Sequence, residues 1–200
     1  MSRTLLSLAA VLTAGIATAT FQPQEQPPNH PQVPDQAPTT MPQQKEMPVA
    51  QPEDVESIDA IMSAYYNLED GERGQERNWD RVRSLYHPDA RLMAARPNSK
   101  GGCDAFVFSV DDYLKSEQKY LERGGYFADE LFRTVEQYGN VAQVFSTYES
   151  RRSAQDEKPY SRGINSFQLV NDGERWWIMS ILWDFERGTN PIPEKYLGDG

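Results

Sequence analysis

Proline and aromatic residues divide this chain into two parts with different folding prospects. All ten tyrosines and all four tryptophans lie after residue 60, whereas nine of the fourteen prolines lie between residues 22 and 52. Proline removes a backbone hydrogen-bond donor and favours extended conformers, and a stretch without aromatic residues buries too little apolar surface to offset its chain entropy. We therefore predict a disordered spacer over residues 20–52, one domain with a single core over 53–187, and a tail over 188–200.

The first nineteen residues have the layout of a secretory signal peptide. Arg3 supplies a positive charge, Leu5 to Ile16 form an apolar run of twelve positions, and Ala17 to Ala19 offer small residues before a cleavage site. A membrane anchor is the alternative, but a span needs about 20 apolar residues. We expect cleavage of residues 1–19, a periplasmic or secreted protein, and no membrane insertion after cleavage.

Charge and residue usage exclude several classes of partner. Residues 53–200 carry 18 lysines and arginines against 27 aspartates and glutamates, a net formal charge of −9, which is repelled by the phosphate backbone of nucleic acids. This part has one histidine, His87, and one cysteine, Cys103, which are too few for a zinc site, so we predict no metal. It has no glycine-rich phosphate loop and no nucleophile-elbow serine, and we predict no cofactor. A lone thiol forms no internal disulfide, so we expect an exposed thiol or a bond between molecules.

The spacing of apolar residues changes along the domain from helical to strand-like. The expected helices cover residues 54–69, a short segment after Asn78 that ends before Pro88, and a segment from Ser109 to Gly124. The expected strands cover residues 90–95, 105–108, 127–138, 141–151, 160–170 and 175–185. Helices first and long strands last indicate an α+β fold. We predict a cone-shaped, curved antiparallel sheet whose concave side is covered by the three N-terminal helices.

This order of elements, together with three short motifs, resembles the nuclear transport factor 2-like superfamily and, within it, the SnoaL-like branch. The motifs run from Tyr86 to Leu92, from Val141 to Glu149, and from Gly173 to Ile178, and the resemblance covers residues 54–186. It implies a cone-shaped barrel with an apolar pocket and homodimers through the sheet. It implies no single activity, because members include isomerases, cyclases, dehydratases, epoxide hydrolases and non-catalytic binding domains.

Asp184 and His87 are the candidate catalytic residues. If Asp184 ends an apolar row on the last strand, burial raises its pKa and lets it exchange protons. His87, the only histidine of the domain, can act as a general base near neutral pH. Asp184 can instead be a sheet-end residue paired with Arg162 or Arg187. His87 can instead be a turn residue that caps the second helix, and a single histidine differs from the family's dehydratases, which use two in the pocket.

Five residues are candidates for ligand contact. Tyr148 can donate a hydrogen bond to a carbonyl or enolate, and Arg162 can hold a carboxylate. Asn165 lies on the same strand as Arg162. Tyr65 and Trp183 complete the set, although a core position is the simpler interpretation for Tyr65. A slip of one residue exchanges the two faces of a strand, so a cross-strand ladder facing water is the alternative for the strand residues.

Three functions follow as alternatives. The first is a binding domain with a pocket for a small, largely apolar molecule. The second is a cofactor-independent acid–base enzyme, an isomerase, cyclase or hydrolase, with Asp184 or His87 as the base and Tyr148 or Arg162 as the electrophilic partner. The third is a structural or protein-interaction module. A pocket filled by tyrosine and tryptophan side chains would exclude the first two functions and favour this one.

Overall fold

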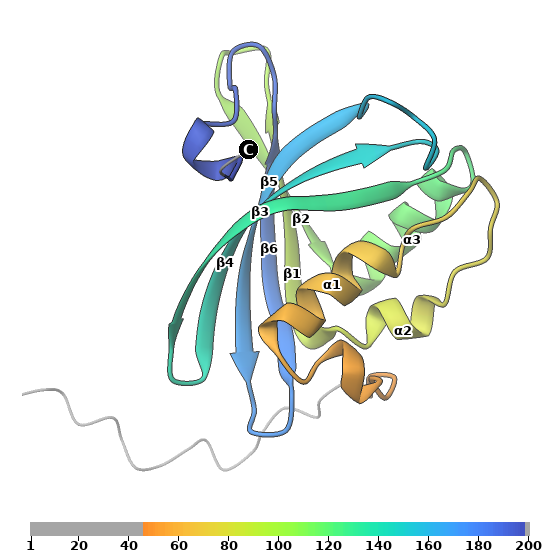
Figure 1. Cartoon of the computed structure of the whole chain (residues 1–200), viewed down its shortest axis with the longest axis vertical. Helices are drawn as coiled ribbons and strands as arrows, with labels where there is room; N and C mark the ends of the chain where they lie inside the picture. The colour runs from red at the N-terminus through yellow and green to blue at the C-terminus, as the bar shows by residue number, and fades with distance from the viewer. Residues whose placement is uncertain (1–45, 199–200) are drawn as a thin grey trace, which may run out of the picture. The chain divides into compact units, whose positions relative to one another are not determined.

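Six strands form one sheet in the computed structural model, which describes residues 46–198 (Figure 1). The strands are β1 (Tyr86–Pro97), β2 (Cys103–Ser109), β3 (Phe127–Tyr138), β4 (Val141–Arg151), β5 (Ser161–Asn171) and β6 (Trp176–Phe185). Their order across the sheet is β2-β1-β6-β5-β4-β3. The predicted signal peptide and the predicted spacer up to residue 45 lie outside the described residues.

One of the five strand pairings is parallel, and the other four are antiparallel. The parallel pair is β1 with β6, where Leu92 lies opposite Ile181. The turns that join β3 to β4 and β5 to β6 use Gly139 and Gly173, which adopt positive φ angles of 55° and 101°. The expected curved α+β sheet is confirmed, but its purely antiparallel character is wrong, because the last strand returns to the centre of the sheet beside β1.

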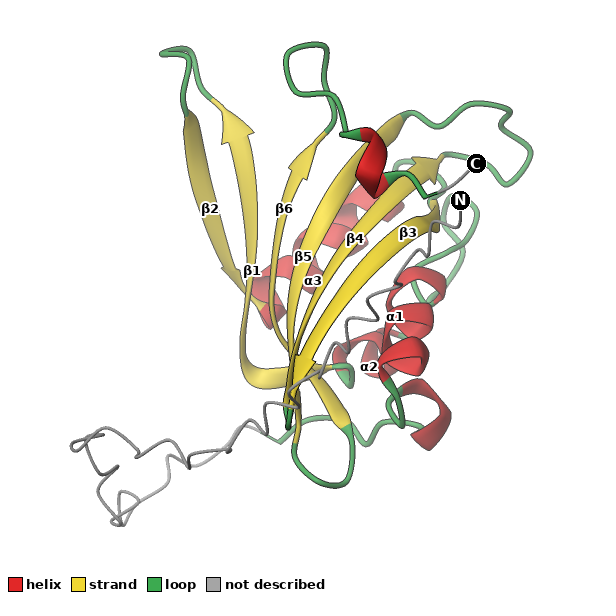
Figure 2. Ribbon diagram, turned by 60° about the vertical axis from the view of Figure 1, so that its left-hand side comes forward, coloured by secondary structure: helices red, strands yellow, loops and turns green. Residues whose placement is uncertain are grey.

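Three helices cover the concave side of the sheet (Figures 1 and 2). They are α1 (Ile58–Asn67), α2 (Trp79–Arg83) and α3 (Val110–Leu121). Each begins at a polar cap, because the side chains of Ser57, Asn78 and Ser109 accept the backbone N–H of the third residue that follows. Among residues 46–198, no helix is long and apolar enough to cross a membrane.

The hydrophobic core lies between the helices and the inner face of the sheet. It joins Ile61 and Met62 of α1 to Leu92 of β1, Phe167 of β5 and Ile181 of β6, and the side chains of all five are buried. These residues come from both ends of the domain sequence. The core therefore forms only when β6 is in place between β1 and β5.

The chain before α1 is tied to the rest of the domain. A short 3-10 helix, η1 (Pro52–Asp54), places Asp54 where it accepts two hydrogen bonds from Arg81, from Nε at 2.7 Å and from Nη2 at 2.8 Å. Met47 and Ala50 pack against the core. Residues before position 53, where the sequence analysis placed the domain boundary, thus contact the core.

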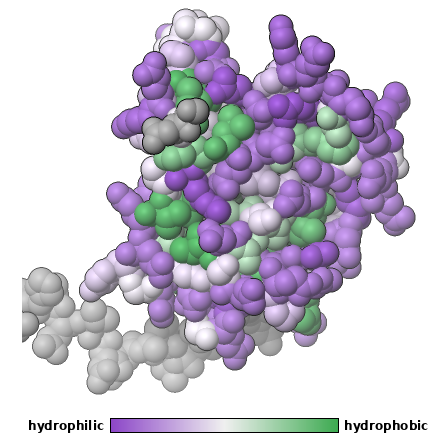
Figure 3. All heavy atoms as spheres, viewed as in Figure 1, coloured by the Kyte–Doolittle hydropathy of each residue, from purple (hydrophilic) through white to green (hydrophobic). Residues whose placement is uncertain are grey.

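The C-terminal segment returns across the outer face of the sheet, opposite the helices (Figure 2). It contains a 3-10 helix, η2 (Glu194–Tyr196). Thr147 Oγ1 donates a hydrogen bond to the backbone oxygen of Tyr196 at 2.6 Å, and the rings of Phe145 and Tyr196 lie 5.0 Å apart. The residues predicted as a tail therefore contact the sheet. Figure 3 shows hydrophobic surface in separate patches among hydrophilic residues.

Candidate functional site

A cavity of about 270 Å³ lies between the helices and the inner face of the sheet, and we call it the inner pocket. Eight of its fourteen lining residues are aromatic: Tyr65, Tyr113, Tyr120, Tyr126, Tyr148, Tyr160, Trp183 and Phe185. The others are Arg96, Ser116, Glu117, Ser150, Ser161 and Asn165. The pocket therefore combines aromatic rings with many hydroxyl groups, one amide, one carboxyl and one guanidinium.

A glycine on the neighbouring strand makes room for Tyr148. Tyr148 of β4 pairs with Gly163 of β5, and both are buried on the inner face. A Cβ atom at Gly163 would lie 3.0 Å from Tyr148 Oη and 2.6 Å from the backbone oxygen of Asp184. Real Cβ atoms do not tolerate such contacts, so a larger residue here would displace the ring from the pocket wall.

A chain of hydrogen bonds fixes the amide of Asn165. Asn165 Nδ2 donates to Tyr66 Oη at 3.1 Å, and Tyr66 Oη donates to Ser146 Oγ at 2.7 Å. Ser146 Oγ donates to Glu130 Oε1 at 2.5 Å. The carboxylate only accepts, so the direction of donation is set along the whole chain. No hydrogen bond to Asn165 Oδ1 is seen among residues 46–198.

Two carboxyl groups, those of Glu117 and Glu69, lie near one another at the helical side of the inner pocket. Glu117 of α3 lines the cavity, and Glu69, two residues after α1, is only 5% exposed. Burial raises the pKa of Glu117 to about 7. Burial first, and the charge of Glu117 second, raise the pKa of Glu69 well above its ordinary value. Two such groups resist ionising together, so the pair retains a proton at neutral pH.

Arg77 holds the loop that carries Glu69. Its guanidinium donates to three backbone oxygens, from Nε to Glu69 at 2.6 Å, from Nη2 to Gly71 at 2.7 Å and from Nη1 to Gln75 at 2.9 Å. Arg77 is 8% exposed. All three oxygens belong to the loop that follows α1, where the backbone has no regular helix or strand partners, and Arg77 supplies donors for them. The position of the Glu69 carboxyl therefore depends on this arginine.

Ring-to-ring contacts hold the tyrosines of the inner pocket in place. Tyr65 packs edge-on against Phe167 at 4.9 Å and against Tyr66 at 5.0 Å, measured between ring centroids. Tyr113 packs edge-on against Trp183 at 6.1 Å. Such pairs are rigid and contribute about 1 kcal/mol each beyond their buried area. Burial also raises the pKa of Tyr65 and Tyr113, so both stay neutral phenols.

Comparisons with known proteins find matches by structure and none by sequence. Neither protein-family models nor curated proteins give a match. A protein of unknown function with a cystatin-like fold from Nostoc punctiforme matches with a TM-score of 0.51 and 8% identity, over 66% of this chain and 90% of that chain. The β subunit of a protein assigned as an aromatic-ring-hydroxylating dioxygenase from Novosphingobium aromaticivorans matches with a TM-score of 0.50 and 14% identity, over 68% and 95%. A protein from Streptomyces avermitilis, assigned as a dehydratase of the nuclear transport factor 2-like family, has a TM-score of 0.49 and 16% identity, over 68% and 97%.

The fold, a curved mixed sheet with helices on its concave side, is shared with these solved structures. At these identities the likeness establishes the fold alone and assigns no activity. The SnoaL-like branch stays a prediction from the sequence motifs.

Four of the predicted site residues meet in the inner pocket of this domain. Tyr65, Tyr148, Asn165 and Trp183 all line it. They come from α1, β4, β5 and β6, so the fold brings together residues separated by more than a hundred positions. Their contact with a ligand stays a prediction.

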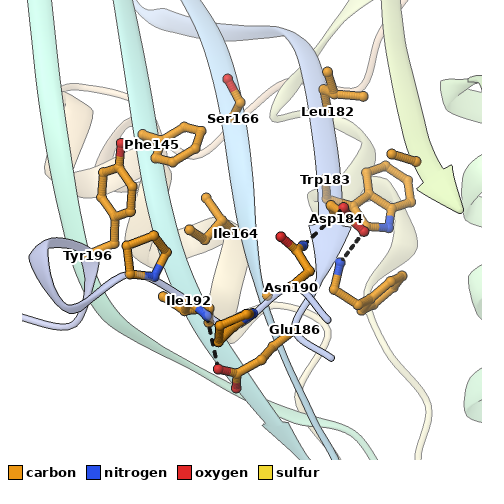
Figure 4. Close-up of a pocket in the computed structure, with 15 residues that line it drawn as sticks. Phe145, Ile164, Ser166, Leu182, Trp183, Asp184, Glu186, Asn190, Ile192 and Tyr196 are labelled. Atoms are coloured by element: carbon orange, nitrogen blue, oxygen red, sulfur yellow. Dashed lines mark hydrogen bonds between the residues drawn. The ribbon is translucent and has the colours of Figure 1, made fainter. Parts of the chain in front are cut away.

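Asp184 lies on the outer face of the sheet, beside a second cavity of about 320 Å³ (Figure 4). The pairing of β5 with β6 shifts register between Ile178 and Ser180, so Leu182 and Asp184 do not continue the inward row of Ile178. Arg187 Nη1 donates to Asp184 Oδ1 at 2.6 Å, and this hydrogen bond lowers the pKa of the carboxyl. The expected buried carboxyl with a raised pKa is therefore corrected, and the alternative pairing with Arg187 is the one observed.

His87 and Arg162 also lie apart from the inner pocket. His87 belongs to β1, where a turn was expected, because β1 begins at Tyr86 and pairs with β6 there. Its ring packs edge-on against Trp177 at 5.8 Å, and its Nδ1 accepts the backbone N–H of Asp89 at 3.2 Å. Arg162 Nε lies 3.5 Å from Glu186 Oε2. None of these side chains lines the inner pocket.

Glu117 and Glu69 are the site residues that the sequence analysis missed. Glu117 had a visible signal, since it stands three residues after Leu114 and four before Leu121, on the apolar stripe of its helix. A carboxyl in such a stripe faces the core or a cavity. Glu69 had no comparable signal, because its burial depends on Arg77 and the loop that follows α1.

Metal-binding clusters and disulfides are absent from the described part of the chain. Within residues 46–198, no group of three or more histidine, cysteine, aspartate and glutamate side chains is placed to hold a metal ion. Cys103, the only cysteine of the chain, is a free and exposed thiol at the start of β2. The candidate chemistry of the inner pocket therefore rests on carboxyl, phenol and amide groups.

Proposed function

We propose that this protein binds a small molecule in the inner pocket. The observation that carries the proposal is an open cavity that is lined by aromatic rings and by two polar groups, Glu117 and Asn165, of which Asn165 is held by a hydrogen bond to Tyr66. Ligand sites have this character, with apolar walls and a few placed polar groups. A cavity that is open also disfavours a purely structural role, which a pocket plugged by aromatic side chains would have supported.

The lining defines the size and chemistry of the ligand. A cavity of about 270 Å³ admits roughly ten non-hydrogen atoms, since a water molecule occupies about 30 Å³ in the liquid. Tyrosine rings suit a flat apolar body, while Asn165 Oδ1 and the Glu117 carboxyl suit a hydrogen-bonding group. The ligand that we propose is therefore amphipathic, which modifies the expectation of a largely apolar molecule.

A bulky residue at the pocket wall should abolish binding. Ser116 lines the inner pocket on an exposed face of α3, so Ser116→Trp can fill the cavity without disturbing the core. We expect it to weaken binding of the probe 2-phenylethanol by at least tenfold, or about 1.4 kcal/mol. Calorimetry of the wild type and the variant measures this. Lys115→Trp, at an exposed neighbouring position outside the lining, is the matched control, and equal loss in both variants would contradict the proposal.

A second candidate function is acid–base catalysis by Glu117. The observation that favours it is the position of this carboxyl in the cavity together with its pKa of about 7, which suits a general base at neutral pH. Several phenols share the cavity and can donate hydrogen bonds to developing negative charge. This candidate replaces the earlier pair of bases, Asp184 and His87, with a carboxyl inside the pocket.

Glu117→Gln should abolish general-base catalysis if this second function holds. The probe is 5-nitrobenzisoxazole, whose C3 proton is taken by a carboxylate while the C–H electrons form a nitrile, the N–O bond breaks, and the ring opens to one product, a cyanophenolate. We expect the variant to lose about 10²-fold in rate or more. The wild-type rate should rise with pH and level off above about 7, because only the ionised carboxyl accepts the proton. A rate equal to that of buffer, or one that Glu122→Gln lowers equally, would exclude this function.

Export and self-association complete the proposal. The run from Leu5 to Ile16 supports export, and exposed apolar side chains on the sheet, such as Val135, Val141 and Leu182, support a homodimer through that surface. Native mass spectrometry of the protein purified from its host would report the mature N-terminus, the oligomeric state and any retained ligand in one measurement.

A further inference from the structure

Aromatic rings and a carboxyl group share the inner pocket, and this combination bears on the charge of the ligand. Tyr65, Tyr113, Tyr126 and Tyr148 line the same cavity as Glu117. The face of a tyrosine ring carries negative electrostatic potential and attracts cations within about 6 Å of its centroid. Aromatic walls beside a carboxylate therefore favour a cation over a neutral or anionic group.

A cation of the protein itself, the guanidinium of Arg152, already lies over two tyrosine rings of the pocket. Its guanidinium carbon lies 4.6 Å from the ring centroid of Tyr120 and 4.1 Å from that of Tyr160, and both rings line the cavity. Among the residues that the structure describes, no cation lies over the more deeply buried rings of Tyr65 and Tyr113. The rings of Tyr120 and Tyr160 thus have a resident cation, whereas those of Tyr65 and Tyr113 have none among the described residues.

The two carboxyl groups have no cation in ion-pair contact among the described residues, although the charge of Arg77 partly offsets the raised pKa of Glu69. Neither Glu69 nor Glu117 forms an ion pair within residues 46–198. Glu69 Oε1 is buried without a hydrogen bond, while the donors of Arg77 go to backbone oxygens. A buried carboxyl oxygen without a partner is costly unless a proton or an incoming cation compensates it.

An anionic ligand has little support from the lining. Arg96 is the only lining side chain with a positive charge. It is exposed, and its guanidinium lies over the ring of Phe106 at 5.3 Å. The net charge of −9 over residues 53–200 adds a general repulsion of anions.

We infer that the ligand of the inner pocket is an organic cation, an ammonium group on a small apolar body, with the ammonium beside Glu117 and against the tyrosine rings. This inference rests on the proposed function and narrows it to a class of ligand. Asn165 Oδ1, which accepts no hydrogen bond from the described residues, adds an acceptor for an ammonium N–H.

The inference implies that affinity depends on pH. Several titratable or charged groups around the pocket can influence the protonation of Glu117. They are Glu69 after α1, Tyr86 and Arg96 on β1, Tyr113 on α3 and Tyr148 on β4. The phenols stay neutral because burial raises their pKa, so the carboxyl pair supplies the titration. Below pH 7 a proton occupies Glu117 and competes with the ammonium, whereas above pH 7 the carboxylate is available. An alkylammonium keeps its own charge to about pH 10.

Calorimetry with three probes of similar size tests the inference on the purified full chain. The probes are 2-phenylethylammonium, 2-phenylethanol and phenylacetate. At pH 8 we expect the ammonium to bind about tenfold more tightly than the alcohol, and phenylacetate to bind least. From pH 6 to pH 8 the affinity for the ammonium should rise by up to about tenfold, and that for the alcohol should stay flat.

Glu117→Gln should bring the dissociation constants of the ammonium and the alcohol within about threefold of each other. Glu122→Gln, an exposed glutamate just after α3, is the matched control and should keep the difference. If Glu117→Gln fails to fold, the pH series on the unchanged chain decides. Binding of the alcohol at least as tight as that of the ammonium overturns the inference and leaves the proposed function standing. Binding of none of the three probes overturns both.

Discussion

Arg77→Ala is expected to lower the free energy of unfolding by about 4 kcal/mol. The guanidinium is buried and donates hydrogen bonds to the backbone oxygens of Glu69, Gly71 and Gln75. Removing it takes a donor from each of these oxygens, of which that of Gly71 keeps the backbone N–H of Tyr126 at 3.0 Å. It also removes the positive charge that favours the ionised form of two acidic neighbours, Glu69 and Asp70. Urea unfolding followed by tryptophan fluorescence measures the difference.

The control for this prediction lies in the same loop. Arg73 is exposed and far less connected, so Arg73→Ala should change the unfolding free energy by no more than about 0.5 kcal/mol. Arg77→Lys should restore only a minor part of the loss, because a single ammonium cannot present donors along three directions as a planar guanidinium does. Similar stabilities for Arg77→Ala and Arg73→Ala would show that the three hydrogen bonds contribute little.

Gly125→Ala is expected to destabilise the fold by roughly 3 kcal/mol or more. A Cβ atom at Gly125 would lie 2.1 Å from the backbone oxygen of Arg152 and 3.3 Å from that of Gly71. Both contacts are with backbone, so no side-chain rotation relieves them and the chain itself must shift. Thermal unfolding followed by circular dichroism measures the loss.

Gly124→Ala is the matched comparison, one residue away. Its Cβ atom would meet only the side chain of Arg152, at 3.3 Å from Nη1 and 3.5 Å from Cδ, and a side chain can shift by a few tenths of an ångström more easily than the backbone can. We expect a change within about 1 kcal/mol. Equal melting temperatures for the two alanine variants would contradict the close backbone approach at Gly125. Tyr126, the next residue, lines the inner pocket, so Gly125→Ala should also weaken ligand binding.

The sequence predicts the long strands well and their faces less well. The bounds of β3 and β4 agree with the predicted ranges, because β-branched and aromatic residues are concentrated there and Gly139 marks the turn between them. The start of β1 was read as a turn, since His87 and Pro88 are good turn residues. Its strand conformation comes from pairing with β6, about ninety positions further along the chain, and local sequence carries no trace of that contact.

Asp184 shows where the alternation of residues along a strand fails to predict which face of the sheet a side chain occupies. Both faces of β6 carry apolar side chains, so the register shift near Ile178 leaves no mark in the sequence. The β5 residues Gly163 and Asn165 follow a regular alternation and are both buried on the inner face. The candidate site was thus predictable where a strand is regular. It was not predictable where a bulge or a loop, such as the one that carries Glu69, decides the placement.

The parallel contact between β1 and β6 has a consequence for how the chain folds. Until residues 176–185 are available, the β1–β2 hairpin and the β3–β4–β5 meander have no strand to join them into one sheet. The two sub-structures must therefore wait for the last strand, and closing so long a loop makes folding slow, in the range of milliseconds to seconds typical of non-local sheets. We therefore expect the sheet to assemble completely when β6 is present and not at all when it is missing. A chain that ends before Trp176 would contain all the tyrosines of the inner pocket, but these would have no cavity to surround.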